Sequence, residues 1–179
     1  KITLRNTKPF NSAAGLRLQT DLGYEYVDSR FKPLERLRNV EFTRDWGLPL
    51  VVSPSDETIV NAATALIDAK GNSVKYQFTT YNRGREFTGI RNSVYHIQNI
   101  KGWKFNNVFN LSNINSTLNQ GYFLRPVIDV SRQFPKLRNY VVEFNYAIEH
   151  NEIRNKNTDT VIAQSFSFQT FKTAIKSSQ

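Results

Sequence analysis

The sequence of 179 residues contains no cysteine, and this excludes disulfide bonds, thiolate catalysis and cysteine-based zinc sites. The chain therefore differs from the small secreted scaffolds that disulfides hold together. No apolar run approaches the roughly eighteen residues that a membrane helix needs, so a helical membrane protein is excluded. A membrane β-barrel is not excluded, because its strands are short and alternate in polarity.

Motifs that carry chemistry are also missing. The chain has no Walker loop, no dinucleotide fingerprint and no G-x-S-x-G elbow. Its only histidines are His96 and His150, and neither stands at a metal-ligand spacing. His150 lies between Glu149 and Glu152, a group that we expect at a solvated strand end rather than around a metal. We therefore expect no catalytic residue, no metal and no cofactor, and a protein that is not an enzyme.

What the sequence does contain is strict alternation of apolar and polar residues. Side chains of a strand point to alternate faces, so each such segment predicts a strand with one apolar and one polar side. Weaker strand candidates are Arg38–Trp46, Glu57–Asp68, Ser93–Ile100 and Thr160–Thr173, of which the second also fits a short helix. The five clearest alternating segments are Gly15–Val27, Ser73–Tyr81, Trp103–Ser112, Tyr122–Ser131 and Tyr140–His150.

The connections between these segments predict a meander. "DAKGNS" and "IKGW" contain the glycines of hairpin turns, and "QFPKLRN" is a short link with a proline. Longer polar connections are expected at "VDSRFKPLER", "GLPLVVSPSDE", "YNRGREFTGIRN" and "HNEIRNKNTDT". The chain is therefore expected to be all-β, an antiparallel up-and-down meander, with residues 1–179 forming a single β domain or a barrel segment.

Each predicted strand divides its residues between two faces. The polar face carries charges of both signs in mid-strand, and these would pair and be hydrated if they lined a lumen. The polar, lumen-facing candidates are Arg17, Asp21, Glu25, Lys75, Lys104, Arg125, Asp129, Glu143 and Glu149. The candidates for the lipid-facing or core-facing side are Leu18, Leu22, Tyr24, Phe78, Phe105, Phe109, Ile128, Phe144 and Tyr146.

Two architectures share this alternation. A β-barrel, or part of one, would turn the apolar face to lipid, and the long strands favour it because strands of about nine to eleven residues cross a bilayer. Its interfacial girdles would be made by Tyr24, Tyr26, Tyr81, Trp103, Tyr122, Phe123 and Tyr140. The alternative is a soluble β-sandwich or jelly roll, secreted or periplasmic, with its apolar faces packed together and exposed aromatic rings that bind carbohydrate.

The formal net charge of +9 predicts affinity for anions such as lipid phosphate, acidic glycans or nucleic acid. Nucleic acid is not expected, because a reader of single strands needs aromatic and basic residues on the same face. A glycosidase would need two carboxylates close together. Asp129 with a carboxylate of the next strand is the remaining arrangement, and we expect a lattice of salt bridges there instead.

Three stretches of the chain resemble large outer-membrane β-barrel proteins of Gram-negative bacteria: "RNVEFTRDWGL", "YQFTTYNRGREFTGIRN" and "FLRPVIDVSRQFPKLRNYVVEFNYAIEHNEIRN". The resemblance lies in the texture of strands and loops over most of the chain. It implies a barrel segment in the bacterial outer membrane, with a structural, transport or cell-surface role. Such barrels end on a strand with a terminal aromatic residue, whereas this chain ends "AIKSSQ", so a piece of a larger barrel is expected. The implied partners are the lipid bilayer or lipopolysaccharide and protein subunits of an outer-membrane assembly.

Overall fold

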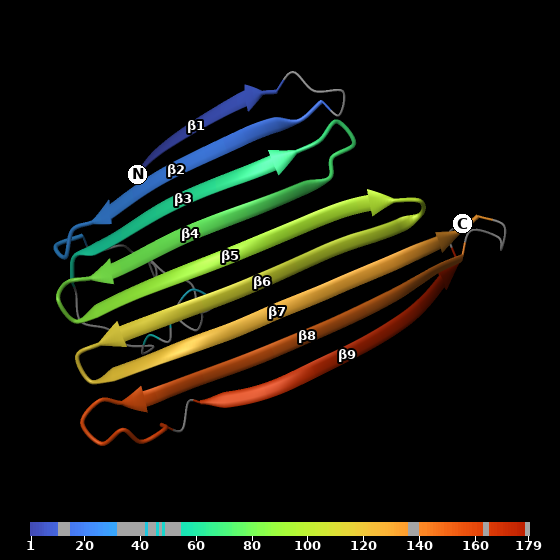
Figure 1. Cartoon of the computed structure of the whole chain (residues 1–179). Coiled ribbons are helices and arrows are strands. Elements are labelled where there is room, and N and C mark those ends of the chain that lie inside the picture. Colours follow the sequence, from blue (N-terminus) through green and yellow to red (C-terminus); the bar gives the residue numbers. More distant parts are fainter. Residues whose placement is uncertain are drawn as a thin grey trace.

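The computed structural model describes residues 1–10, 15–31, 42, 46, 48, 55–135, 140–162 and 165–177. Within these residues nine strands lie side by side in chain order in one antiparallel sheet (Figure 1). The predicted all-β antiparallel meander is confirmed. The sheet is open, with β1 and β9 at opposite edges, so these strands do not close into a barrel by themselves. The strands are β1 Ile2–Pro9, β2 Arg17–Val27, β3 Glu57–Ile67, β4 Ser73–Arg83, β5 Phe87–Ile100, β6 Trp103–Ser116, β7 Asn119–Phe134, β8 Tyr140–Asn155 and β9 Phe166–Ser177.

Most of the predicted strands are present, and several are longer than expected. The ambiguous segment Glu57–Asp68 is strand β3, which pairs with β2 and β4 along its whole length. The candidate Ser93–Ile100 is the second half of β5. The candidate Thr160–Thr173 is only partly right, because β9 begins at Phe166 and continues to Ser177. Strand β1 was not predicted, because its apolar residues Ile2 and Leu4 alternate too briefly to make a clear pattern.

Tight turns join most neighbouring strands. Lys101 and Gly102 link β5 to β6 with φ angles of 47° and 81°, the left-handed pair that suits the twist of a two-residue hairpin. In the turn between β3 and β4, the Asp68 carboxylate accepts the backbone N–H groups of Lys70 and Asn72, both at 2.8 Å. Both predicted hairpins are therefore present.

Two predicted long connections are wrong. Within "YNRGREFTGIRN" the chain turns between Arg83 and Phe87, and the remaining residues extend β4 and β5. In "HNEIRNKNTDT" the first residues extend β8 as far as Asn155. In both stretches the alternation reverses. Phe87 and Ile153 lie on the side that carries Lys75 and Glu149, whereas Glu152 and Arg154 lie on the other side. For this reason the pattern alone places the strand ends too early.

The connection between β2 and β3, residues 28–56, is here called the connector. Of the predicted strand Arg38–Trp46, only Phe42 and Trp46 belong to the described residues, and both lie off the sheet. The Trp46 N–H donates to the Phe42 carbonyl oxygen at 3.1 Å, as in one turn of a helix. The "QFPKLRN" link lies largely outside the described residues. None of the helices in the described ranges is both long and apolar enough to span a membrane.

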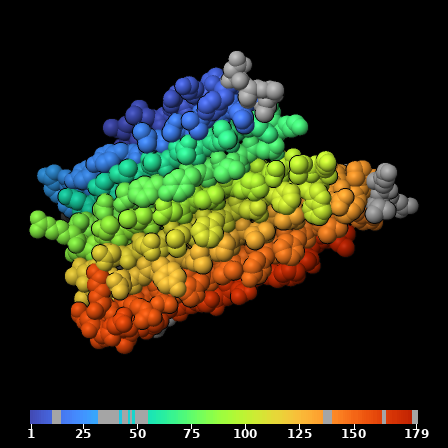
Figure 2. All heavy atoms as spheres, in the orientation of Figure 1, coloured from blue at the N-terminus to red at the C-terminus, as the bar shows by residue number. Residues whose placement is uncertain are grey.

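The two faces of the sheet differ sharply in burial. A row of partnered residues from Leu18 through Leu66, Val74 and Ile128 to Phe171 lies on what we call the apolar face. Large side chains on that face are exposed, up to 63% for Phe171 and 74% for Ile175. The opposite side, the polar face, carries the core cluster of Trp46, Ile59, Tyr81, Phe87, Ile114, Phe123 and Ile153. In space-filling form the neighbouring strands make one broad, continuous surface (Figure 2).

Candidate functional site

The register places every predicted site residue on the face expected from the alternation. All of the polar candidates, Arg17, Asp21, Glu25, Lys75, Lys104, Arg125, Asp129, Glu143 and Glu149, lie on the polar face. All of the apolar candidates, Leu18, Leu22, Tyr24, Phe78, Phe105, Phe109, Ile128, Phe144 and Tyr146, lie on the apolar face. The polar face is therefore the candidate functional surface of the sheet.

Ion pairs between adjacent strands cross this polar face. Each joins a basic to an acidic side chain on a neighbouring strand, so the acidic side chains in these pairs are compensated. The exposed pairs contribute about 1 kcal/mol or less each, and their main effect is to arrange the charges, whereas Arg83 and Glu57 are buried. The pairs are Lys1–Glu25 at 3.8 Å, Arg5–Asp21 at 2.5 Å, Arg83–Glu57 at 3.9 Å, Arg125–Glu149 at 3.0 Å and Lys176–Glu143 at 2.6 Å.

The arrangement needed for a glycosidase is not formed by Asp129. The register places Asn145 directly opposite Asp129, and the Asn145 amide donates to the Asp129 carboxylate at 2.5 Å. Glu143 and Glu149 each bind a basic side chain instead. These carboxylates are therefore held by amide or cationic partners.

The two histidines bind neighbouring polar side chains. His150 Nε2 lies 2.9 Å from the Tyr122 hydroxyl, and His96 Nδ1 lies 3.2 Å from the Asn107 amide. Glu149 lies on the opposite face from His150, so these neighbours in sequence do not converge. Across the described ranges, no group of three or more histidine, aspartate or glutamate side chains is placed to hold a metal ion.

An aromatic cluster covers one end of the polar face, where β4 ends and β5 begins. Trp46 of the connector is 2% exposed and Tyr81 is fully buried, with their ring centroids 5.6 Å apart. The Arg91 guanidinium lies 4.6 Å from the Trp46 ring, a cation–π contact. The ring lies over Gly89, where a β-carbon would collide with it. Gly89 thus provides the space in which the connector packs on the sheet.

This cluster corrects one sequence-based expectation. Tyr81 and Phe123 were predicted among the aromatic girdle residues, but both point to the polar face and belong to the buried core. Their partner, Trp46, comes from a connector far from both in sequence. Trp46 packs on the strand glycine Gly89, but the two residues are far apart in the sequence. No local sequence pattern therefore predicts this contact.

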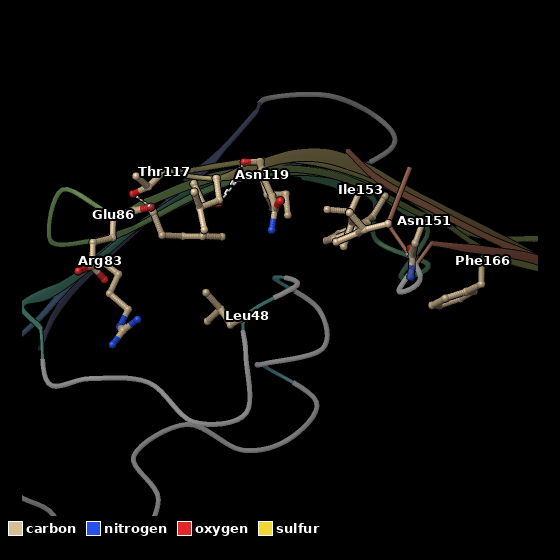
Figure 3. A pocket seen from close by; sticks show the side chains of 14 residues that line it. Leu48, Arg83, Glu86, Thr117, Asn119, Asn151, Ile153 and Phe166 are labelled. Carbon is tan, nitrogen blue, oxygen red and sulfur yellow. Dashed lines mark hydrogen bonds between the residues drawn. The ribbon is translucent and has the colours of Figure 1, made fainter. Parts of the chain in front are cut away.

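Beside the cluster lies a cavity of about 830 Å³ (Figure 3). The strand residues Phe87, Ile114 and Ile153 line it, and Leu48 of the connector lies on the side away from the strands (Figure 3). Polar groups stand at its margins, with Arg83 and Glu86 near one end and Asn119 and Asn151 farther along (Figure 3). Phe166 of the edge strand β9 marks the other end. This cavity and the ion pairs lie on the same face.

The ends of the connector are held together by hydrogen bonds. The Ser29 N–H donates to the Asp56 carboxylate at 2.7 Å, and the Gly84 N–H donates to the Asp56 carbonyl oxygen at 2.8 Å. The hydrogen bond from Ser29 holds the pKa of the Asp56 carboxyl below its usual value. Asp56 therefore joins the start of the connector, its end and the turn after β4.

Searches against protein families, curated proteins and solved structures found no match to this chain. Its function must therefore be inferred from the arrangement of its own residues.

Proposed function

We propose that this chain forms part of the wall of an outer-membrane β-barrel, with its apolar face in lipid and its polar face lining a hydrated, partly plugged lumen. Its role is structural and transport-related, at the surface of a bacterium. The observation that carries the proposal is the band of exposed apolar side chains across all nine strands. Soluble monomers rarely expose contiguous apolar surface beyond a few hundred Å².

The band runs obliquely to the rows of paired residues, as the tilted strands of a barrel require. On β1 and β2 it includes the partners Leu4 and Leu22. Following that row across the sheet leads to His150 and Ser167 on β8 and β9, which are polar. On β9 the large apolar residues of this face are Phe171 and Ile175, farther along the strand. Rows of paired residues run perpendicular to the strands. Because the strands of a barrel are tilted in the membrane, a band parallel to the membrane plane crosses these rows at an angle equal to the tilt of the strands.

Strand length supports the same reading. Strands β2, β3 and β4 each have 11 residues, and at about 3.3 Å per residue such a strand is about 36 Å long. A tilt of about 45° reduces its height to about 25 Å, which is the height of the apolar band of outer-membrane barrels. Strands of soluble proteins are typically about five or six residues long.

Several polar residues on the apolar face are hydrogen-bonded to one another. The Tyr76 hydroxyl donates to the Asn92 amide oxygen at 2.6 Å, and Asn107 lies 3.2 Å from His96. Hydrogen bonding of this kind lowers the cost of placing polar groups in an apolar environment. These hydrogen-bonded polar residues are therefore compatible with contact between the apolar face and lipid.

The open edges favour a segment of a larger barrel. In an antiparallel meander of nine strands, β1 and β9 run in the same direction, so they lack the geometry for antiparallel closure. Bacterial single-chain barrels close with an even number of strands. Further strands, from the same protein or from other subunits of an outer-membrane assembly, would then pair with both edges.

The test uses the absence of cysteine in the chain. Phe109 and Asn110 are neighbours on β6 that point to the apolar and polar faces, respectively. Single variants Phe109→Cys and Asn110→Cys would carry an environment-sensitive fluorophore in protein refolded into vesicles with nitroxide-labelled lipid. We expect quenching at position 109 and not at 110, because only the apolar face meets lipid.

Lack of quenching at both positions, with a monodisperse protein in solution without detergent, would refute the barrel. The apolar face would then be packed within protein, and carbohydrate binding would become the function to measure. Fractionation of the native source cells provides an independent readout. An antibody to the "HNEIRNKNTDT" stretch should detect the protein in the outer-membrane fraction.

A further inference from the structure

Charged residues are rare on the apolar face, and their distribution along it is uneven. The strands carry Lys8, Arg132, Glu152 and Arg154 there. Glu152 and Arg154 are at the end where the connector lies, and they pair with each other at 2.6 Å. Lys8 and Arg132 lie toward the opposite end, here called the far end, where β5 turns into β6. Among the residues that the structure describes, neither forms an ion pair.

Arg132 lies between two aromatic rings. Its guanidinium is 4.8 Å from the Trp103 ring and 4.9 Å from the Phe134 ring. Tyr140 is the partner of Phe134 on β8, and Lys101 occupies the turn just before Trp103. We call Lys101, Trp103, Arg132, Phe134 and Tyr140 the basic–aromatic corner. The rings hold the guanidinium by cation–π contacts, and Arg132 as a residue is exposed.

The row that contains Arg132 is otherwise apolar and exposed. Its partners are Trp103 and Val142, and the row continues to Ile100 on one side and Ile175 on the other. Trp103 is 38% exposed, Val142 41% and Ile100 49%. Arg132 is thus a single cation without an ion pair in an exposed apolar row. Such a residue is expected at the depth where the hydrocarbon core of a membrane meets anionic headgroups. Tryptophan and tyrosine gather at that depth in membrane proteins.

We infer that the basic–aromatic corner binds the phosphate of an anionic phospholipid headgroup at the membrane surface. Arg132 supplies two parallel N–H donors for the phosphate oxygens, which is the geometry that favours arginine over lysine for phosphate. Lys101 adds positive charge from the adjacent turn. The inference rests on the proposed function, because it requires the apolar face to lie in a bilayer.

The other end of the same face supplies the matched comparison. Arg154 is on the same face and is also a strand arginine, but Glu152 and Asp159 lie 2.6 Å and 3.7 Å from it. Its charge is therefore compensated within the protein. Loss of the Arg154 charge should not change affinity for anionic lipid, whereas loss of the Arg132 charge should.

The test uses the full chain with Trp46→Phe, so that Trp103 is the only remaining tryptophan of the two in the sequence. Partition into vesicles of phosphatidylcholine, with and without phosphatidylglycerol, would be followed by Trp103 fluorescence and its quenching by brominated lipid. We expect phosphatidylglycerol to strengthen partition. Arg132→Gln should weaken it about fivefold, the effect of about 1 kcal/mol for one basic residue at an anionic surface, and Arg154→Gln should leave it unchanged. Arg132→Lys keeps the positive charge but loses the two parallel donors, so it should retain only part of the preference.

Each contrary result has a distinct meaning. Equal partition into both vesicle types, unaffected by Arg132→Gln, would overturn the headgroup site and leave the barrel proposal intact. Failure of the chain to partition into either vesicle would overturn the headgroup site as a property of this chain, and fractionation of the native source cells would test the barrel proposal separately. Displacement by inorganic phosphate, but not by chloride at the same ionic strength, would show a site for free phosphate and overturn the assignment to lipid.

Discussion

The contact between Trp46 and Gly89 gives the sharpest test of how the connector is held on the polar face. A β-carbon at Gly89 would overlap the six-membered ring of Trp46 and would lie 3.1 Å from Phe87 Cε1. Gly23 is also a strand glycine on the polar face, but a β-carbon there would approach nothing closer than Asn61 Cβ at 3.6 Å. The two glycines differ chiefly in what lies above them.

Gly89→Ala should therefore destabilise the protein by about 1–3 kcal/mol, the usual cost of forcing extra volume into a packed core. Gly23→Ala should be neutral or stabilise by about 0.4–1 kcal/mol, because alanine restricts the unfolded chain. Urea unfolding in detergent micelles would measure both. In a Trp103→Phe background, the emission of Trp46 should shift to longer wavelength in Gly89→Ala if the ring leaves its site.

A double-mutant cycle separates this clash from a general effect on β5. With Trp46→Leu the ring is absent, so adding Gly89→Ala should cost much less than it does in the parent chain. The difference between the two costs measures the coupling of residues in direct contact. Equal costs for Gly89→Ala in both backgrounds, or equal costs for Gly89→Ala and Gly23→Ala, would refute the packing argument.

Two further predictions concern acid and charge. The hydrogen bond from Ser29 lowers the pKa of Asp56 in the folded protein from its ordinary 3.8. Asp56 therefore stabilises the fold above pH 3.8, and this stabilisation is lost as the pH falls through the lower folded pKa. Asp56→Asn should abolish this part of an acid titration followed by Trp46 fluorescence. Replacing Arg17, Lys104 and Arg125 with glutamate should reverse the anion preference of the lumen, and unchanged ion selectivity in a bilayer recording would exclude a role for these residues.

Faces were predictable from the sequence because they depend on a local rule. Alternation in Trp103–Ser112 alone assigns Phe109 and Asn110 to opposite sides, and the register across the sheet maintains that assignment. Strand ends were less predictable. The β4–β5 hairpin continues through Arg83 and Phe87 because pairing with neighbours supplies hydrogen bonds that the polar composition of the segment does not reveal.

The candidate site was predictable only in part. Its charged residues follow from alternation, but their pairing depends on which strands are neighbours and at what register. Arg125 binds Glu149 across β7 and β8, and Glu143 binds Lys176 across β8 and β9. The aromatic cluster depends on the path of the connector, which brings Trp46 to Tyr81 and Gly89. Such contacts between distant segments have no signature within a window of sequence.

The charged residues of the two edge strands indicate which kind of strand would pair with them in the proposed barrel. Lys172 and Lys176 of β9 and Arg5 of β1 lie on the polar face of the two edge strands. Two copies joined through β9, or through β1, would bring like charges together along the seam, and directly opposed like charges destabilise a sheet. Neighbouring strands within the sheet instead pair basic with acidic residues, as Arg125 of β7 does with Glu149 of β8. Strands that continue the barrel should therefore carry acidic residues on their lumen side and apolar residues on the other, which distinguishes them from a second copy of this chain.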